Sequence, residues 1–258
     1  MSQPTLQPDY SYLNNFLGRI DKKSNQVGEF QLAKIRSIIK KMRKDDPIGA
    51  QLAEANVELY LSNLDKSINL LEDLLYKTNN SFISAWELML SAYMEHGDLN
   101  KVLETLNRLH AEKLLHKKEF RKVYGHAISV YLLEDIIKMQ NSSTYGSFGD
   151  IVLNHVERLR ELDISIQVYR TLVSILYRIF FSTYSGVIQP ELCFSESTLT
   201  VRANSTINNP EDLFEINNKL NDQIMLWYSN SNDVDQKQIE KISAYFRHKE
   251  CEPKSMVV

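Results

Sequence analysis

The sequence predicts an all-α fold, and three observations lead to that prediction. The 258 residues include only eight glycines and six prolines, whereas sheet-rich folds need many turns and glycine-rich corners. Apolar residues recur at helical spacing along most of the chain, as in Leu32, Ile35, Ile38, Ile39 and Met42. Turn-forming residues separate these stretches at short intervals. Helix is therefore expected over roughly 70% of the chain, about twice the share in an average globular protein.

The first 46 residues are predicted to form N-terminal helices. One extends from Pro8 to about Ile20, and the next carries the apolar stripe from Leu32 to Met42. Pro47 ends that helix and begins another, because proline disfavours helical geometry in the residue before it yet fits a first helical turn.

Residues 47–116 are predicted to form two antiparallel helix hairpins. In the second hairpin, Gly97 suits the left-handed residue that ends a helix, and Asp98 suits the cap of the next one. The return helices of the two hairpins align with a period of 35 residues, in the pairs Ser67 and Val102, Leu71 and Leu106, and Leu74 and Leu109.

The second hairpin resembles the tetratricopeptide repeat (TPR). Trp86, Tyr93 and Gly97 occupy the positions at which that family has its Trp, Tyr and Gly. The sequence departs from the family pattern at three positions, Leu90, Val102 and Leu114. The resemblance covers about residues 48–115 and implies TPR-like antiparallel helix hairpins in an α-solenoid or superhelical bundle.

Residues 117–184 are predicted to form further helical hairpins. A long helix extends from Phe120 to about Gln140, and a strongly apolar helix from Ile166 to about Tyr184. Arg170 and Arg178 interrupt the apolar helix, and a membrane-spanning helix would bury both at a cost. We therefore predict a core helix and no membrane segment.

The last two predicted regions are an irregular loop at 185–210 and C-terminal helices with a tail at 211–258. Leu199-Thr200-Val201 alternates as a strand would, but a single strand has nothing to pair with, so loop is expected. The final amphipathic helix is predicted to span about Asp233 to Phe246.

Charge, cysteine content and the N-terminal sequence argue against a polyanion-binding protein and against a secreted, disulfide-rich protein. The formal charge of −3 and the pI of about 6.1 do not indicate general binding to polyanions. Cys193 and Cys251 form no disulfide-scaffold spacing, and the N-terminus lacks the features of a secretory signal. A cytoplasmic location is expected.

Motifs for catalysis, cofactors or metals are absent from the sequence, which lacks HExxH, paired CxxC, phosphate-binding loops and GxSxG. We therefore expect no catalytic residue, no cofactor and no metal. The exception is the R-x4-H spacing of Arg121 and His126, which is similar to that of helical ribonucleases of the HEPN type. In that family Arg and His would bind the scissile phosphate and shuttle protons. The residue directly after the Arg is generally Asn, Asp or His in that family, whereas this sequence has Lys122.

Two surfaces are predicted to bind partners. In the tetratricopeptide family ligands contact the concave face of the first helix of each hairpin, and the resemblance places Ser84, Glu87, Ser91, Met94 and Glu95 there. These residues favour a basic or apolar partner segment. A second helix carries the basic residues Lys34, Arg36, Lys40, Lys41, Arg43 and Lys44. That run is interpreted as a solvated helix face, with docking to an acidic protein and nucleic-acid binding as alternatives.

The function expected from these features is a non-catalytic adaptor or scaffold subunit that binds a partner helix or peptide through a helical groove. The first alternative is a nucleic-acid-associated regulator or effector subunit that uses the basic helix at 34–44. The second alternative is a HEPN-like ribonuclease.

Overall fold

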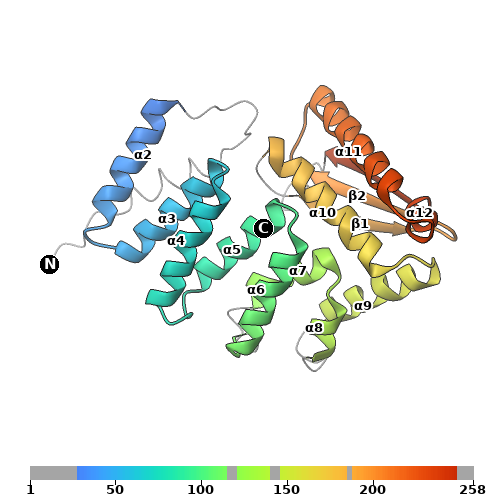
Figure 1. The fold of residues 1–258 in the computed structure, drawn as a ribbon, viewed down its shortest axis with the longest axis horizontal. Coiled ribbons are helices and arrows are strands. Elements are labelled where there is room, and N and C mark those ends of the chain that lie inside the picture. Colours follow the sequence, from blue (N-terminus) through green and yellow to red (C-terminus); the bar gives the residue numbers. More distant parts are fainter. Residues whose placement is uncertain (1–27, 115–120, 140–145, 185–187, 249–258) are drawn as a thin grey trace, which may run out of the picture. The chain divides into compact units, whose positions relative to one another are not determined.

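The computed structural model describes four segments of the chain, residues 28–114, 121–139, 146–184 and 188–248. About 70% of this part is helical, in eleven helices, and a small three-stranded sheet accompanies them (Figure 1). The helix predicted from Pro8 to Ile20 lies outside the described residues.

The chain divides into two compact units. Unit 1 comprises Met1–Gly125 with Thr183–Ser185, and unit 2 comprises His126–Ser182 with Gly186–Val258. The boundary falls within one helix, α7 (Arg121–Tyr131).

Unit 1 is built from consecutive helices that pack against their neighbours. These are α2 (Glu29–Met42), α3 (Pro47–Tyr60), α4 (Leu64–Lys77), α5 (Ile83–Glu95) and α6 (Leu99–Ala111). Each packs against the next, and α3 also packs against α5. This arrangement is compatible with a helical repeat, and it follows the hairpins predicted from the sequence.

Local capping explains where these helices begin and end. The Asp46 carboxylate accepts a hydrogen bond from the Gly49 amide at 2.8 Å, with Pro47 in the first turn of α3. Asp98 caps α6 in the same way through the Lys101 amide at 3.1 Å. Gly97 has φ 66°, the left-handed conformation predicted for it.

The core of unit 1 contains the positions that align between the hairpins. Ser67, Leu71, Leu74, Val102, Leu106 and Leu109 are all buried. Trp86 is also fully buried, and its indole donates a hydrogen bond to the Asn80 carbonyl at 3.0 Å. The Arg108 guanidinium lies 5.1 Å from the centre of the indole ring. Trp86 is therefore a core residue of the hairpin stack.

Unit 2 contains the rest of α7 and the helices α8 (Glu134–Met139), α9 (Gly146–Glu161), α10 (Ile166–Thr183), α11 (Pro210–Asn230) and α12 (Asp233–Ile239). Nine of the 18 residues of α10 are buried, which confirms it as a core helix. Asn209 caps α11 by accepting a hydrogen bond from the Glu211 amide at 3.0 Å.

The long helix predicted from Phe120 to Gln140 is interrupted. Leu132 adopts a left-handed φ of 48° between α7 and α8. The carbonyls left open at the end of α7 are satisfied from α10, because Tyr169 Oη donates to Val130 at 3.0 Å and Arg170 donates to Tyr131 at 2.9 Å and to Leu132 at 3.2 Å. These donors from a distant segment make the break favourable.

The sheet corrects the prediction of an all-α fold with an irregular loop at 185–210. Its strands are β1 (Gln189–Phe194), β2 (Leu199–Ser205) and β3 (Ile242–His248), in the order β1-β2-β3. β1 and β2 are antiparallel, and β2 and β3 are parallel. The prediction of a final helix over 233–246 was also wrong beyond Ile239, since residues 242–248 form β3. β3 is the pairing partner that the prediction lacked for a strand at Leu199-Thr200-Val201.

One face of the sheet and one of its edges are covered within unit 2. Leu199, Val201 and Ala203 are fully buried, and the ring of Phe246 stacks on Phe180 of α10 with centres 6.1 Å apart. At the outer edge of β3, the Asn217 side chain of α11 donates to the Phe246 carbonyl at 3.0 Å and accepts from its amide at 2.8 Å. The Asn217 amide thus pairs with β3 as another strand would.

Candidate interaction surfaces

The basic face of α2 is the first candidate surface. It consists of the six predicted cations, Lys34, Arg36, Lys40, Lys41, Arg43 and Lys44, all of which are exposed. Arg43 and Lys44 lie in the turn that follows the last residue of α2, Met42. The opposite side of the helix is apolar and packs on Ala50 and Val57 of α3. A helix held on one side and charged on the other presents its cations in a fixed arrangement.

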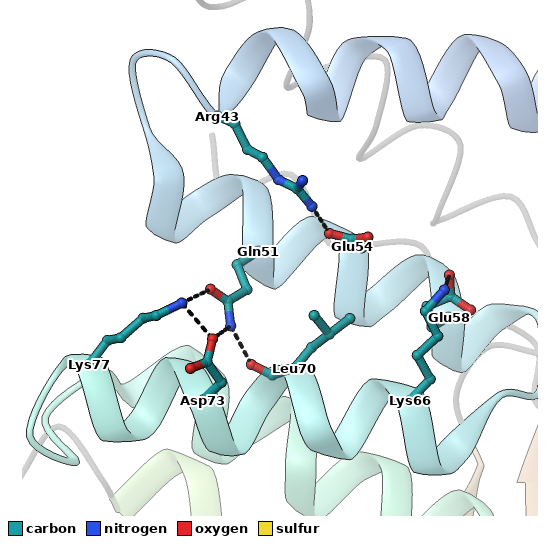
Figure 2. Close-up of polar contacts among 8 residues, drawn as sticks. All are labelled: Arg43, Gln51, Glu54, Glu58, Lys66, Leu70, Asp73 and Lys77. Atoms are coloured by element: carbon teal, nitrogen blue, oxygen red, sulfur yellow. Dashed lines mark hydrogen bonds and ion pairs between the residues drawn. The ribbon is translucent and has the colours of Figure 1, made fainter.

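The cations of the basic face differ in how far they are neutralised. Arg43 forms an ion pair with Glu54 of α3 (Figure 2), and the charge of Arg36 helps to lower the pKa of Glu58. Within the described part of the chain, Lys40, Lys41 and Lys44 form no ion pair. These three lysines are the cations most available to a partner.

An exposed aromatic residue extends the basic face. Phe30, at the start of α2, is 83% exposed. Phe30, Lys34 and Lys41 follow one another at intervals of four and seven residues within α2, which places them along one side of the helix. Helical spacing is the signal in the sequence that connects Phe30 with Lys34 and Lys41.

A network of hydrogen bonds connects α3 with α4 (Figure 2). The Gln51 amide donates to the Leu70 carbonyl at 2.7 Å and to Asp73 at 2.8 Å, and Lys77 bonds both Asp73 at 2.5 Å and Gln51 at 3.1 Å. The hydrogen bond from Lys77, followed by that from Gln51, lowers the pKa of Asp73. The network links two helices through side chains that are partly open to solvent.

Glu58 forms a second, buried link between α3 and α4. Its side chain is 3% exposed and accepts hydrogen bonds from Lys66 at 2.7 Å and Asn63 at 2.8 Å. Burial raises the pKa of Glu58, but the hydrogen bonds from Lys66 and Asn63 and the charge of Lys66 together bring it below its ordinary value. Glu58 is therefore a carboxylate held in place by its partners.

The five positions predicted for a partner groove all lie on α5. Glu87 and Ser91 are exposed, Ser84 and Glu95 are partly exposed, and Met94 is only 4% exposed. Met94 thus belongs to the core of unit 1, while Glu87 and Ser91 form the open part of the predicted surface. Sequence spacing could not tell Met94 from its neighbours, because its burial depends on packing between helices.

The residues of the R-x4-H motif both lie on α7. The side chain of Arg121 is outside the described part. His126 is exposed, and its Nε2 lies 3.2 Å from Tyr177 Oη on α10. Although the residue as a whole is exposed, part of its imidazole is buried, and this desolvation lowers the pKa of His126 and favours the neutral ring. A hollow of about 290 Å³ is lined by His126, Ser129, Val130, Gln189 and Pro190.

A further surface, on α11, was not predicted from the sequence. Phe214 and Met225 are 68% and 62% exposed, and Leu226 on the same helix is also exposed. They lie outside the apolar stripe through Ile216 and Leu220, which packs inward. Their spacing of eleven residues, three helical turns, was the signal that could have revealed them.

The described ranges contain neither a cluster of metal ligands nor a single membrane-spanning helix. No group of three or more His, Cys, Asp or Glu side chains there is arranged to hold a metal ion. No single helix there has the length and hydropathy to cross a bilayer. The segments Phe148–Glu161 and Ile166–Thr183 meet that test only as a pair, and they are bent by 113°.

Comparisons with known proteins place these surfaces in no established family. No protein-family model, curated protein or solved structure matches the chain.

Proposed function

We propose that the chain is a non-catalytic adaptor or scaffold subunit that acts by binding other proteins. The hairpins α3–α4 and α5–α6 are TPR-like in this proposal, and α2 packs against the first of them. Support comes from the burial of all six aligned positions and from the packing of α3 on both α4 and α5. Hairpin stacks of this kind present extended surfaces to partner segments.

The observation that carries the proposal is the basic face of α2. Lys40 and Lys41 project from a helix whose other side is fixed on α3, Lys44 lies in the turn that follows it, and Phe30 extends the same surface. Cations held in a fixed arrangement next to an exposed ring match an acidic segment with an apolar anchor. On α5, the exposed Glu87 and Ser91 provide a separate contact for a basic or apolar segment.

The adaptor proposal is tested by affinity purification of the tagged chain from its source, with nuclease added. We expect a stoichiometric protein partner that is retained after nuclease treatment and is lost from the Lys40→Glu/Lys41→Glu double variant. The matched control is Lys219→Glu/Lys237→Glu, which reverses two exposed lysines on α11 and α12. Equal recovery of the partner with both variants would contradict a role for the basic face.

Nucleic-acid binding is the alternative function, and Phe30 favours it. Single-strand binders combine cations with exposed aromatic rings on which bases stack, at about 1–3 kcal/mol per base. If this function is correct, labelled single-stranded oligonucleotide binds with a salt slope that falls by about 0.7 for each lysine removed. Phe30→Ala also weakens binding in that case, whereas an oligonucleotide that does not bind at low salt excludes it.

A HEPN-like ribonuclease based on Arg121 and His126 ranks third. The hollow beside His126 supports it, and the lowered pKa leaves a neutral imidazole that could accept a proton. His126→Ala is expected to abolish RNA cleavage by the purified chain. Cleavage that survives this substitution would exclude the proposal.

A further inference from the structure

The outward side of α11 carries a row of residues spaced as in a helix-packing seam. We call this the outer row, and it consists of Phe214, Asn218, Asn221 and Met225, all exposed. Their intervals of four, three and four residues are those along which two helices pack side by side. The row spans about 16 Å of the helix. Ile216 and Leu220, on the opposite side, are buried in unit 2.

Exposed apolar side chains are concentrated on this helix. Over the described ranges, nine large apolar side chains are exposed, and Phe214, Met225 and Leu226 of α11 are three of them. Single exposed apolar residues are ordinary, but Phe214 and Met225 share one side of α11, so that one partner helix can cover both. Phe214 and Met225 stand at the two ends of the outer row, where each can anchor one end of a partner helix.

Carboxylates define the charge of the partner. Glu211, Glu215 and Asp222 are exposed beside the outer row. The whole helix contains four carboxylates and one lysine, for a net charge of −3. Pairing α11 with a second copy of itself would bring these carboxylates together and is therefore unfavourable. A helix bearing Lys or Arg at its flanking positions would complement them.

We propose that the outer row of α11 binds one amphipathic helix of a partner protein, with apolar residues covering Phe214 and Met225 and with Lys or Arg facing Glu211, Glu215 and Asp222. Asn218 and Asn221 lie at the centre of the seam, where amide side chains set the register of the paired helix. This surface lies in unit 2 and has the opposite charge to the basic face of α2. The inference therefore does not depend on the function proposed for α2.

The test uses two synthetic helical peptides and the full chain. Both fluorescein-labelled peptides carry Leu at the seam positions, and the flanking positions are Lys and Arg in one and Glu in the other. We expect fluorescence anisotropy to give a Kd at least tenfold lower for the basic peptide. Equal affinity for the two peptides, or no binding of either, would overturn the proposal.

Substitutions on α11 assign the binding to the outer row. Phe214→Ser/Met225→Ser is expected to weaken the basic peptide at least tenfold, and Ile151→Ser is the control because Ile151 is a similarly exposed apolar residue on α9. Glu211→Lys/Glu215→Lys is expected to reverse the preference between the peptides. Its control, Glu157→Lys/Glu196→Lys, reverses two exposed carboxylates elsewhere in unit 2 and should leave the preference unchanged.

Two further measurements separate this inference from other outcomes. The Lys40→Glu/Lys41→Glu variant should bind the basic peptide as well as the original chain does, so failure of the α2 proposal leaves this one standing. Sedimentation should show the same mass for the original chain and for Phe214→Ser/Met225→Ser. A dimer that dissociates in the variant would instead assign the outer row to a second copy of the chain and overturn the proposal.

Discussion

Arg170 has a structural role that its position in an apolar stretch of sequence does not indicate. In the sequence it interrupts an apolar stretch, and it served as evidence against a membrane span. In the structure its guanidinium donates to the Tyr131 and Leu132 carbonyls at the end of α7. Burial lowers the pKa of Arg170, with the charges of Asp135 and Glu134 opposing that effect. The arginine remains charged and serves as a cap that joins α10 to α7.

The first prediction concerns this cap. Arg170→Met keeps the aliphatic stem but leaves two carbonyls without their charged donor, so we expect a loss of about 2–3 kcal/mol in unfolding free energy. Arg178→Met is the matched control, because Arg178 is an exposed arginine on the same helix and should change stability by less than about 0.5 kcal/mol. Urea unfolding followed by circular dichroism measures both. Equal effects of the two substitutions would contradict the capping role.

Which site residues the sequence could identify depends on how local their surroundings are. The exposure of Lys40 and Lys41 follows from helical spacing, since the apolar stripe of α2 lies on the other side. The burial of Met94 and the hydrogen bond between His126 and Tyr177 depend on helices that meet only in the folded chain. Spacing within one helix carries no information about such contacts.

Helix ends without a glycine or a proline are the features that the sequence was least able to predict. Six residues other than glycine have positive φ across the described segments, namely Ser62, Asn79, Asn80, Lys113, Leu132 and Asp163. In several cases the next residue donates back into the preceding helix, as Asn63 does to Glu58 at 2.8 Å and Leu133 to Ile128 at 3.0 Å. Because Leu132 is not a usual turn residue, the break between α7 and α8 could not be predicted.

The second prediction compares two glycines in different conformations. Gly97 has φ 66°, so Gly97→Ala is expected to cost about 1 kcal/mol or more. Gly125 lies within α7, and an added Cβ would meet no atom within 4 Å. Gly125→Ala should therefore raise stability by about 0.5–1 kcal/mol. Thermal unfolding of both variants checks the opposite signs, and a loss of stability in Gly125→Ala would contradict the expected gain.

The elements that the sequence predicted correctly are those with local signals. The helices α2 to α6 each carry an apolar stripe and end at a short turn, so neighbouring residues suffice to identify them. β3 has no such signal. Ile239, Ile242 and Phe246 are spaced by three and four residues as in a helix, and their strand conformation depends on pairing with β2.

At the scale of the whole molecule, the two units differ in their titrating groups. Glu58 in unit 1 and Glu134 in unit 2 both have lowered pKa values. In each case burial opposes the shift, and the hydrogen bonds and positive charges of neighbouring side chains outweigh it. The histidines His126 and His155, both in unit 2, have pKa values lowered by burial. The carboxylates and the histidines therefore change protonation in different ranges of pH.

The third prediction follows from these signs. A carboxylate with a lowered pKa stabilises the fold above its unfolded pKa of about 4.3, and this contribution is lost as the pH falls through the folded value. A histidine with a lowered pKa favours unfolding once the pH falls below about 6.5, because the unfolded chain then binds more protons. Unit 2 should therefore begin to lose stability at a higher pH than unit 1.

The two tryptophans allow this difference to be measured. Trp86 lies in unit 1 and Trp227 in unit 2, and the chain has no others. Fluorescence of Trp227→Phe reports unit 1 through Trp86, and circular dichroism reports the whole chain. His126→Gln/His155→Gln should remove the loss of stability between about pH 6.5 and 5. Identical pH profiles with and without the histidines would contradict the prediction.

The position of β3 in the chain has a consequence for biosynthesis. During translation, β1, β2 and α11 emerge from the ribosome before β3 exists, so the edge of β2 that β3 will occupy stays open until residues 242–248 have been made. Leu199, Val201 and Ala203 make one face of β2 apolar. A premature stop codon or a fusion junction before Ile242 would leave β2 paired with β1 only, with its other edge open. Such a product would be prone to aggregate through that edge.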